Sequence, residues 1–147
     1  MLFRSGLNVP ALKLASGSLG DAPLLRHCAS LGVPLIVSTG GADWADVDRA
    51  VDVLESFGAW FALLHCTAAY PVQNFSELDL LAIVTMRERY PHTVIGWSGH
   101  DAGIAMAVMA HTLGARILEK HVTRNRSLKG TDHARSEERR VGKECRL

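Results

Sequence analysis

The chain has 147 residues, a formal net charge of +1, 48% hydrophobic residues and 21% charged residues. This length and composition are ordinary for one globular domain and exclude an intrinsically disordered chain. With no apolar run near the roughly 18 residues of a membrane span, no signal-peptide pattern and no basic stripe, neither a membrane nor a nucleic-acid partner is expected. The three cysteines lack a Cys-x-x-Cys spacing, so neither a disulfide framework nor a structural zinc site is indicated and a cytoplasmic protein is expected.

Short aliphatic runs alternate with helical patterns along the chain. The runs are nearly continuous, as in parallel strands that are covered on both faces. The predicted strands are Ala11–Ala15, Leu35–Val37, Trp60–Leu64, Val94–Trp97 and Arg116–Val122. The predicted helices are Ala22–Leu31, Asp43–Phe57, Ser76–Tyr90 and Gly103–Leu113. Asp21 and Ser76 are expected as N-caps, and Gly32, Gly58 and Gly114 are expected just past helix ends.

This alternation predicts an α/β fold with a parallel sheet, either a doubly wound open sheet or part of a (β/α)8 barrel. A whole barrel needs about 250 residues, so five strands cannot close one.

The segment 135–147 differs from the rest of the chain, with five Lys or Arg residues, three Glu residues and almost no apolar periodicity. It is expected to be a disordered tail. A further hypothesis is that this segment and residues 1–5 are sequence foreign to the protein.

Each predicted strand ends in polar or small residues, although the strand bodies are apolar. Because the carboxyl ends of parallel strands converge on one face, these residues are the candidates for a functional site. They are Lys13, Ser16 and Gly17; Ser38, Thr39 and Gly40; His65, Cys66, Thr67 and Tyr70; Ser98, Gly99, His100 and Asp101; and Glu119, Lys120, His121 and Thr123.

Two histidines, His100 and His121, follow neighbouring strands. Adjacent parallel strands lie about 5 Å apart, so the two imidazoles could converge on one metal ion. A histidine near a strand end is also a common hydrogen-bonded packing residue, and this alternative stays open. Two imidazoles completed by carboxylate or water would suit Mn²⁺ or a similar divalent ion.

Lys13 lies inside an apolar strand, where a lysine costs free energy unless it is paired or functional. It could be a Schiff-base nucleophile of the aldolase type, or a fixed cation that faces an anionic substrate. The Ser-Gly turns near Ser16, Ser38 and Ser98 offer hydroxyl and backbone N–H groups, which with Lys13 indicate a phosphate site.

For the other polar residues near the strand ends, some are expected at the site and others in packing or turn positions. Glu119 shares a strand face with His121, whereas Lys120 is expected to point toward the helices or to be displaced by a bulge. Asp132 is expected in a loop above the same face, although a loop aspartate is commonly a turn residue. For His65 the site and a buried packing role stay open, and Cys66 is expected to be a small core residue.

Taken together, the strand ends resemble the sialic acid synthase family, which includes N-acetylneuraminate, legionaminate and pseudaminate synthases. The resemblance covers about Val9–Ala134 and rests on five motifs in order. These are LKLASGSLGDAPLLR, LIVSTGGAD, LLHCTAAYPV, IGWSGHDAG and LEKHVTRNRSLKGTDHA. The family fold is a (β/α)8 barrel, so residues 6–134 are expected to be its C-terminal part, strands four to eight. Full-length members are expected to be homodimers.

The resemblance implies a reaction and residue roles. The family condenses phosphoenolpyruvate with an N-acetylated amino sugar aldehyde, such as N-acetylmannosamine, and releases phosphate. His100 and His121 match its metal-binding histidines, which hold Mn²⁺, Mg²⁺ or Co²⁺, and Glu119 matches the glutamate of its Glu-Lys-His block. The matches to its phosphoenolpyruvate-binding residues are Lys13, Ser16, Ser38 and Ser98, and the matches to positions near the sugar are Tyr70 and Asp132.

The chain also departs from the family pattern. Ala68 stands where the family commonly has Asn or Ser, and Gly99 and Asp101 replace the Asp and Thr of the common Ser-Asp-His-Thr block. The resemblance implies the fixed-cation role for Lys13 and leaves a Schiff-base aldolase and a non-catalytic barrel fragment as alternatives. An open five-strand arc exposes strand edges, so the isolated chain is expected to be inactive.

Overall fold

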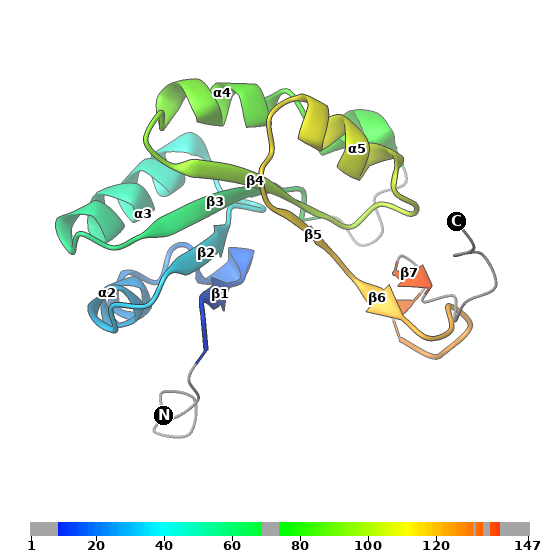
Figure 1. Cartoon of the computed structure of the whole chain (residues 1–147), viewed down its shortest axis with the longest axis horizontal. Helices are drawn as coiled ribbons and strands as arrows, with labels where there is room; N and C mark the ends of the chain where they lie inside the picture. The colour runs from blue at the N-terminus through cyan, green and yellow to red at the C-terminus, as the bar shows by residue number, and fades with distance from the viewer. Residues whose placement is uncertain (1–8, 69–73, 131, 134–135, 139–147) are drawn as a thin grey trace, which may run out of the picture.

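Five parallel strands form one sheet whose order follows the chain, β1-β2-β3-β4-β5, in the computed structural model of the protein. The structure describes residues 9–68, 74–130, 132–133 and 136–138. The sheet strands are β1 (Leu12–Leu14), β2 (Leu35–Ser38), β3 (Phe61–Cys66), β4 (Val94–Gly99) and β5 (Leu118–Lys120). The α/β prediction is therefore confirmed, with the sheet curled as in part of a barrel (Figure 1).

Four helices connect the strands, and Figure 1 shows them on the outer side of the curled sheet. They are α2 (Ala22–Ser30), α3 (Trp44–Ser56), α4 (Ala82–Arg89) and α5 (Ala105–Thr112), with short 3₁₀ helices at η1 (Ser16–Ser18) and η2 (Phe75–Leu78). Asp21 caps α2, as predicted, by accepting a hydrogen bond from the Leu24 N–H. Asp43 caps α3 in a capping box with Asp46.

The third helix is shorter than the predicted segment Ser76–Tyr90. Asp79 has a φ of 41°, in the left-handed region, and this ends η2 before α4 can begin. Aspartate enters that region more readily than most residues, and no helical pattern reveals such a break. The expected N-cap at Ser76 is also wrong, because Asn74 takes that position and accepts from the Ser76 N–H.

The apolar core lies between the sheet and the helices. Alternate strand residues such as Val37, Leu63 and Trp97 are fully buried there, and they pack against helical residues such as Leu54 and Ile83. Burying a large apolar side chain contributes about 1.5–3 kcal/mol, so this outer face stabilises the fold. The other alternate residues point to the inner face, and this leaves the polar strand ends on the inside of the curl.

The predicted fifth strand, Arg116–Val122, is divided. β5 ends at Lys120, which pairs with Gly99, the last residue of β4, and the chain then leaves the sheet at His121. The next strand, β6 (Val122–Thr123), pairs instead with β7 (Glu137–Glu138) in a separate two-stranded sheet. Residues 135 and 139–147 lie outside the described residues.

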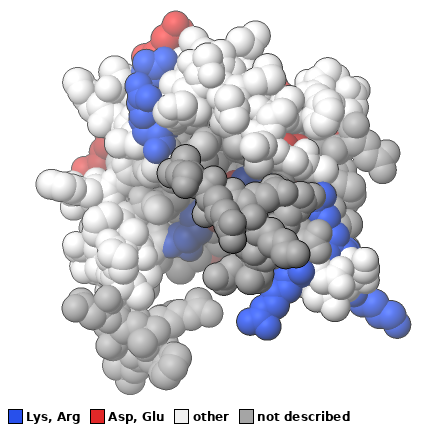
Figure 2. All heavy atoms as spheres, turned by 45° about the vertical axis from the view of Figure 1, so that its right-hand side comes forward, with Lys and Arg blue, Asp and Glu red and all other residues white. Residues whose placement is uncertain are grey.

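The face of the molecule seen in Figure 2 carries both basic and acidic side chains. On the face seen in Figure 2, the basic side chains of the described residues lie in separate groups among uncharged ones. No helix among the described residues is both long and apolar enough to cross a bilayer. On this face, the charged side chains therefore do not single out a functional region.

Candidate functional site

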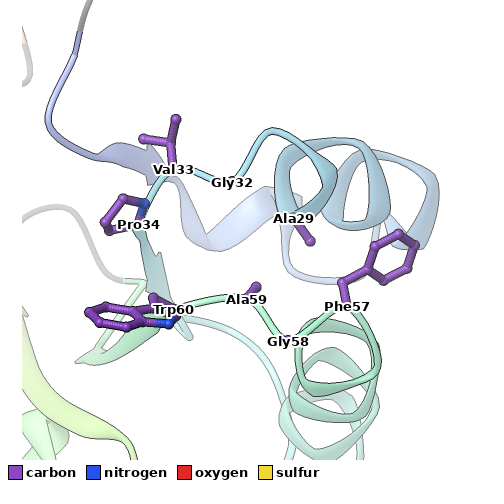
Figure 3. A pocket seen from close by; sticks show the side chains of 8 residues that line it. All are labelled: Ala29, Gly32, Val33, Pro34, Phe57, Gly58, Ala59 and Trp60. Carbon is purple, nitrogen blue, oxygen red and sulfur yellow. The ribbon is translucent and has the colours of Figure 1, made fainter.

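Two cavities of similar size lie at opposite ends of the strands. One, of about 380 Å³, lies at the amino ends of β2 and β3 (Figure 3). Its lining is apolar and includes Pro34, Phe57 and Trp60, so it offers no acid, base or nucleophile. In parallel α/β folds this end of the strands serves stability, whereas catalysis takes place at the carboxyl ends.

The second cavity, of about 370 Å³, lies at the carboxyl ends of the strands and is polar. Its volume is within the usual range for small-molecule sites. It brings together all the residues to which the family resemblance assigned roles, except Tyr70, which lies outside the described residues. The lining residues are Lys13, Ala15, Ser16, Ser38, Cys66, Ser98, His100, Glu119, His121 and Asp132.

The register of the sheet explains this convergence. Cys66 of β3, Ser98 of β4 and Glu119 of β5 are direct neighbours in one row across the sheet, and all three line the cavity. The expectation that Cys66 is only a core residue is therefore incomplete, since it is buried but also borders the site. The available signal was the strand alternation, which places Cys66 two residues after Leu64 on the same inner face.

Lys13 is held by three oxygens. Its Nζ donates hydrogen bonds to Ser38 Oγ at 2.8 Å and to the Leu14 carbonyl at 3.0 Å, and it lies 3.4 Å from Glu119 Oε2. The Lys13 side chain is 32% exposed, so it faces the open cavity rather than the apolar core. The predicted cation is thus placed where an anionic ligand in the cavity could reach it.

Ser16 belongs to the same end of the cavity. Its Oγ accepts a hydrogen bond of 2.9 Å from the Gly40 N–H. A Cβ on Gly40 would lie 2.8 Å from Ser16 Oγ and 3.0 Å from Cys66 Sγ. Glycine at this position therefore lets the loop after β2 approach Ser16 and Cys66, two residues that line the cavity, closely.

The imidazoles of His100 and His121 are neighbours, as predicted. Their ring centroids are 5.4 Å apart with planes tilted by 55°. His100 is buried, and its Nδ1 lies 3.1 Å from the Thr67 carbonyl and 3.8 Å from Cys66 Sγ. His121 Nδ1 lies 3.8 Å from Asp132 Oδ2, so the predicted position of Asp132 above this face is confirmed.

These side chains suit a divalent metal in their chemistry. A carbonyl contact at one ring nitrogen, as at His100, commonly orients histidines that bind a metal through the other. Glu119 Oε2 is buried without a hydrogen bond in the described structure, which leaves it able to accept a further partner. Within the described ranges, however, no three His, Cys, Asp or Glu side chains already stand close enough to hold an ion. The two imidazoles would need water, substrate or a shifted carboxylate to complete the coordination.

Two neighbouring residues face away from the cavity. His65 Nε2 lies 2.7 Å from the Leu78 carbonyl and His65 does not line the cavity, so its packing alternative is confirmed. Lys120 lies on the helix side of β5, also as predicted, and its Nζ donates to the Asp101 carbonyl at 2.6 Å.

The comparisons with known proteins agree on one group of enzymes. The sequence profile of the NeuB family matches residues 2–144. The N-acetylneuraminate-9-phosphate synthase of Drosophila melanogaster is 41% identical over 132 residues, covering 89% of this chain and 35% of that protein. The N,N'-diacetyllegionaminic acid synthase of Legionella pneumophila is 37% identical over 139 residues, covering 91% of this chain and 38% of that protein.

A solved structure shares the fold as well. The crystal structure of an N-acetylneuraminic acid (sialic acid) synthetase from Leptospira borgpetersenii, in complex with citrate, matches with a TM-score of 0.85 and 37% identity. The match covers 89% of this chain and 45% of that chain. The chain thus spans between about a third and a half of the length of these relatives.

Proposed function

Because the chain belongs to the NeuB family, we propose that it carries part of the active site of a sialic acid synthase-type enzyme. The proposed reaction joins phosphoenolpyruvate to an N-acetylated amino sugar aldehyde such as N-acetylmannosamine. C3 of phosphoenolpyruvate forms a bond to the aldehyde carbon, water adds to C2, and phosphate leaves by cleavage of its C–O bond. The product is a nonulosonic acid, and the names of the relatives support this product class.

One observation carries the proposal: the polar cavity combines a cation, hydroxyl groups, imidazoles and carboxylates at the carboxyl ends of the strands. Lys13 would face the phosphate or carboxylate of phosphoenolpyruvate, with hydroxyl groups from Ser16, Ser38 and Ser98 around it. An ammonium group surrounded by hydroxyls suits an anion that has to be bound and later released.

The opposite side of the cavity would receive the aldehyde. His100 and His121 would hold a divalent ion, Mn²⁺ with Mg²⁺ or Co²⁺ as alternatives, and such an ion would supply Lewis-acid polarisation of the aldehyde oxygen. Asp132 lies beside His121 and Glu119 lies beside Lys13, and both line the cavity, where they would orient water or the sugar hydroxyls. Tyr70 would also lie near the sugar, by the resemblance of its motif.

The main alternative is a Schiff-base aldolase that uses Lys13. The contacts of Lys13 favour the fixed cation, because Ser38 Oγ, the Leu14 carbonyl and Glu119 Oε2 all attract its ammonium hydrogens. Borohydride treatment with pyruvate separates the two functions. The synthase leaves Lys13 unmodified, whereas an aldolase gives a reduced pyruvyl adduct on Lys13 that mass spectrometry detects.

We place the five strands as strands four to eight of the barrel in a homodimeric parent. β1 and β5 are the edges of the sheet, and in a closed barrel each would pair with a further strand. A cavity bounded by only five strands lacks part of its wall, so the 147-residue chain alone is expected to release no phosphate from phosphoenolpyruvate.

A chimera tests the function without depending on the isolated chain. Residues 9–133 replace the matching segment of the Leptospira synthetase, and phosphate release is measured with and without the sugar aldehyde. We expect aldehyde-dependent release that chelation abolishes and Mn²⁺ restores. The matched control carries His100→Ala and should be inactive. A folded chimera that releases no phosphate, or releases it without the aldehyde, would contradict the proposal.

A further inference from the structure

Lys120, the last residue of β5, lies directly before His121 and connects β5 to the loop after β4 that carries His100. Its Nζ donates to the Asp101 carbonyl at 2.6 Å, to Asp101 Oδ1 at 3.2 Å and to the Gly103 carbonyl at 2.8 Å. The Lys120 side chain is 12% exposed, and its Nζ lies 5.7 Å from the centroid of the Trp97 ring. These contacts hold one extended side chain in a fixed position between β5 and the loop after β4.

Asp101 is an unusual residue for that loop. It is fully buried, with an exposed fraction of 0%, and its Oδ2 has no hydrogen-bond partner among the described residues. A buried carboxylate is costly unless a cation compensates it, and Lys120 supplies that cation. The loop therefore depends on Lys120 for two different things: a countercharge for one carboxylate, and donors for two main-chain carbonyls.

The loop sequence fits this dependence. A Cβ at Gly99 would overlap the Trp97 indole, so the aspartate that the common family block has at this position could not be placed here without moving Trp97. In this chain the carboxylate follows the histidine, at Asp101, rather than preceding it. The Lys120–Asp101 pair thus depends on the Ser-Gly-His-Asp sequence at residues 98–101, which this chain has in place of the common Ser-Asp-His-Thr block.

We propose that Lys120 is a positioning residue that sets the spacing between the His100 and His121 imidazoles. His100 directly precedes Asp101, and His121 directly follows Lys120, so the Lys120 contacts join the two histidine backbones through one side chain. The consequence for metal binding rests on the function proposed above, but the effect on the imidazole pair does not. Residues that orient metal ligands commonly change metal affinity 10–100-fold when they are replaced.

The first measurement is the Kd for Mn²⁺ alone on the 147-residue chain, from the Mn²⁺ electron paramagnetic resonance signal. Lys120→Met should weaken binding 10–100-fold and lower the Tm, because the buried Asp101 then loses the cation that pairs with it. Lys129→Met, in an exposed loop position, is the matched control and should change neither quantity.

The double variant Lys120→Met/Asp101→Asn separates positioning from charge compensation. Removing the carboxylate charge should recover much of the Tm, whereas the Gly103 and Asp101 carbonyls still lack their donor. We therefore expect the double variant to bind Mn²⁺ at least 10-fold more weakly than the wild type. Wild-type affinity in this variant would overturn the proposal, because Lys120 would then only neutralise Asp101. If Lys120→Met alone does not fold, the double variant still allows the Mn²⁺ affinity to be measured without the Lys120 side chain.

A metal-independent readout distinguishes failure of this inference from failure of the proposed function. The imidazole ¹⁵N signals of His100 and His121 in the metal-free chain at pH 8 should shift in both Lys120 variants and stay unchanged in Lys129→Met. If the wild type binds no Mn²⁺, the proposed metal role fails and these signals still decide the role of Lys120. Unchanged imidazole signals in the double variant would overturn it.

Discussion

Lys13 on the first strand of the sheet and Glu119 on the fifth lie 3.4 Å apart, measured from Nζ to Oε2. Neighbouring strands are spaced about 4.8 Å apart, so on a flat sheet the first and fifth strands would be roughly 19 Å apart. The contact is possible only because the sheet curls and both long side chains reach across its inner face. An ion pair thereby joins the strand that carries Lys13 to the strand that carries Glu119, at opposite edges of the sheet.

This ion pair predicts opposite effects of its two members on anion binding. Lys13→Met should weaken phosphoenolpyruvate binding about tenfold or more, about 1.4 kcal/mol, because the cation is lost. Glu119→Gln should strengthen binding or leave it unchanged, because a competing negative charge disappears and Lys13 keeps its position. Isothermal titration calorimetry at low salt measures both values, since screening reduces the contrast. Weaker binding in both variants would mean that the pair is only structural.

Gly40 is predicted to be sensitive to a single methyl group. Gly40→Ala should push Ser16 Oγ and Cys66 aside and cost about 1–3 kcal/mol of unfolding free energy, typical of overpacking. Binding of inorganic phosphate should weaken in parallel. Gly20→Ala is the matched control, because a Cβ there meets nothing within 4 Å, and its stability should be unchanged or slightly increased. Urea unfolding of both variants gives the comparison.

The histidine pair predicts selective loss of metal binding. His100→Ala and His121→Ala should each reduce Mn²⁺ binding at least 10-fold, because two imidazoles are the ligands best placed to share an ion. His92→Ala, at an exposed position, should bind like the wild type. Relaxation of water protons by bound Mn²⁺ measures the affinities. Equal loss in all three variants would point to a general effect on folding.

On the outer surface, the contacts of Asp48 lead us to expect that the protein loses stability at acidic pH. Hydrogen bonds from Arg89 and from Tyr90, whose OH lies 2.7 Å from Asp48 Oδ1, lower the pKa of Asp48 to about 2. Because this folded-state value is below the ordinary one, the stabilisation is complete above about pH 4 and is lost as the pH falls toward 2. Asp48→Asn should therefore lower the Tm at pH 6 and converge with the wild type near pH 2. The effect should be modest, because the pair is solvent-exposed.

Much of the fold followed from the sequence because the apolar runs mark the strands and because Asp21 marks the start of α2. The polar strand ends also predicted the cavity, since parallel strands bring their carboxyl ends together. The break at Asp79 and the early end of β5 were not predictable, because a left-handed residue and the end of a partner strand depend on tertiary context. For Cys66, the strand alternation indicated the inner face, and the register beside Ser98 shows that this position also borders the cavity.

The contact between Lys120 and Asp101 could not be predicted from the sequence. Alternation predicted only that it points away from Glu119 and His121. Its partner Asp101 is nineteen positions earlier, and the contact exists because β4 and β5 pair with Gly99 beside Lys120. Contacts of this kind depend on the register of two strands, and one sequence without its fold does not contain that register.

The order of the strands has a consequence for how the site forms. Each strand pairs with its neighbour in the chain, so during synthesis every new β-α unit can dock on one that has already emerged. The cavity does not follow this stepwise assembly, because Lys13 and Ser16 come from the first unit and Glu119 and His121 from the last. We expect most of the sheet to be in place before any binding surface exists, so ligand or metal would stabilise the final docking step far more than the early ones.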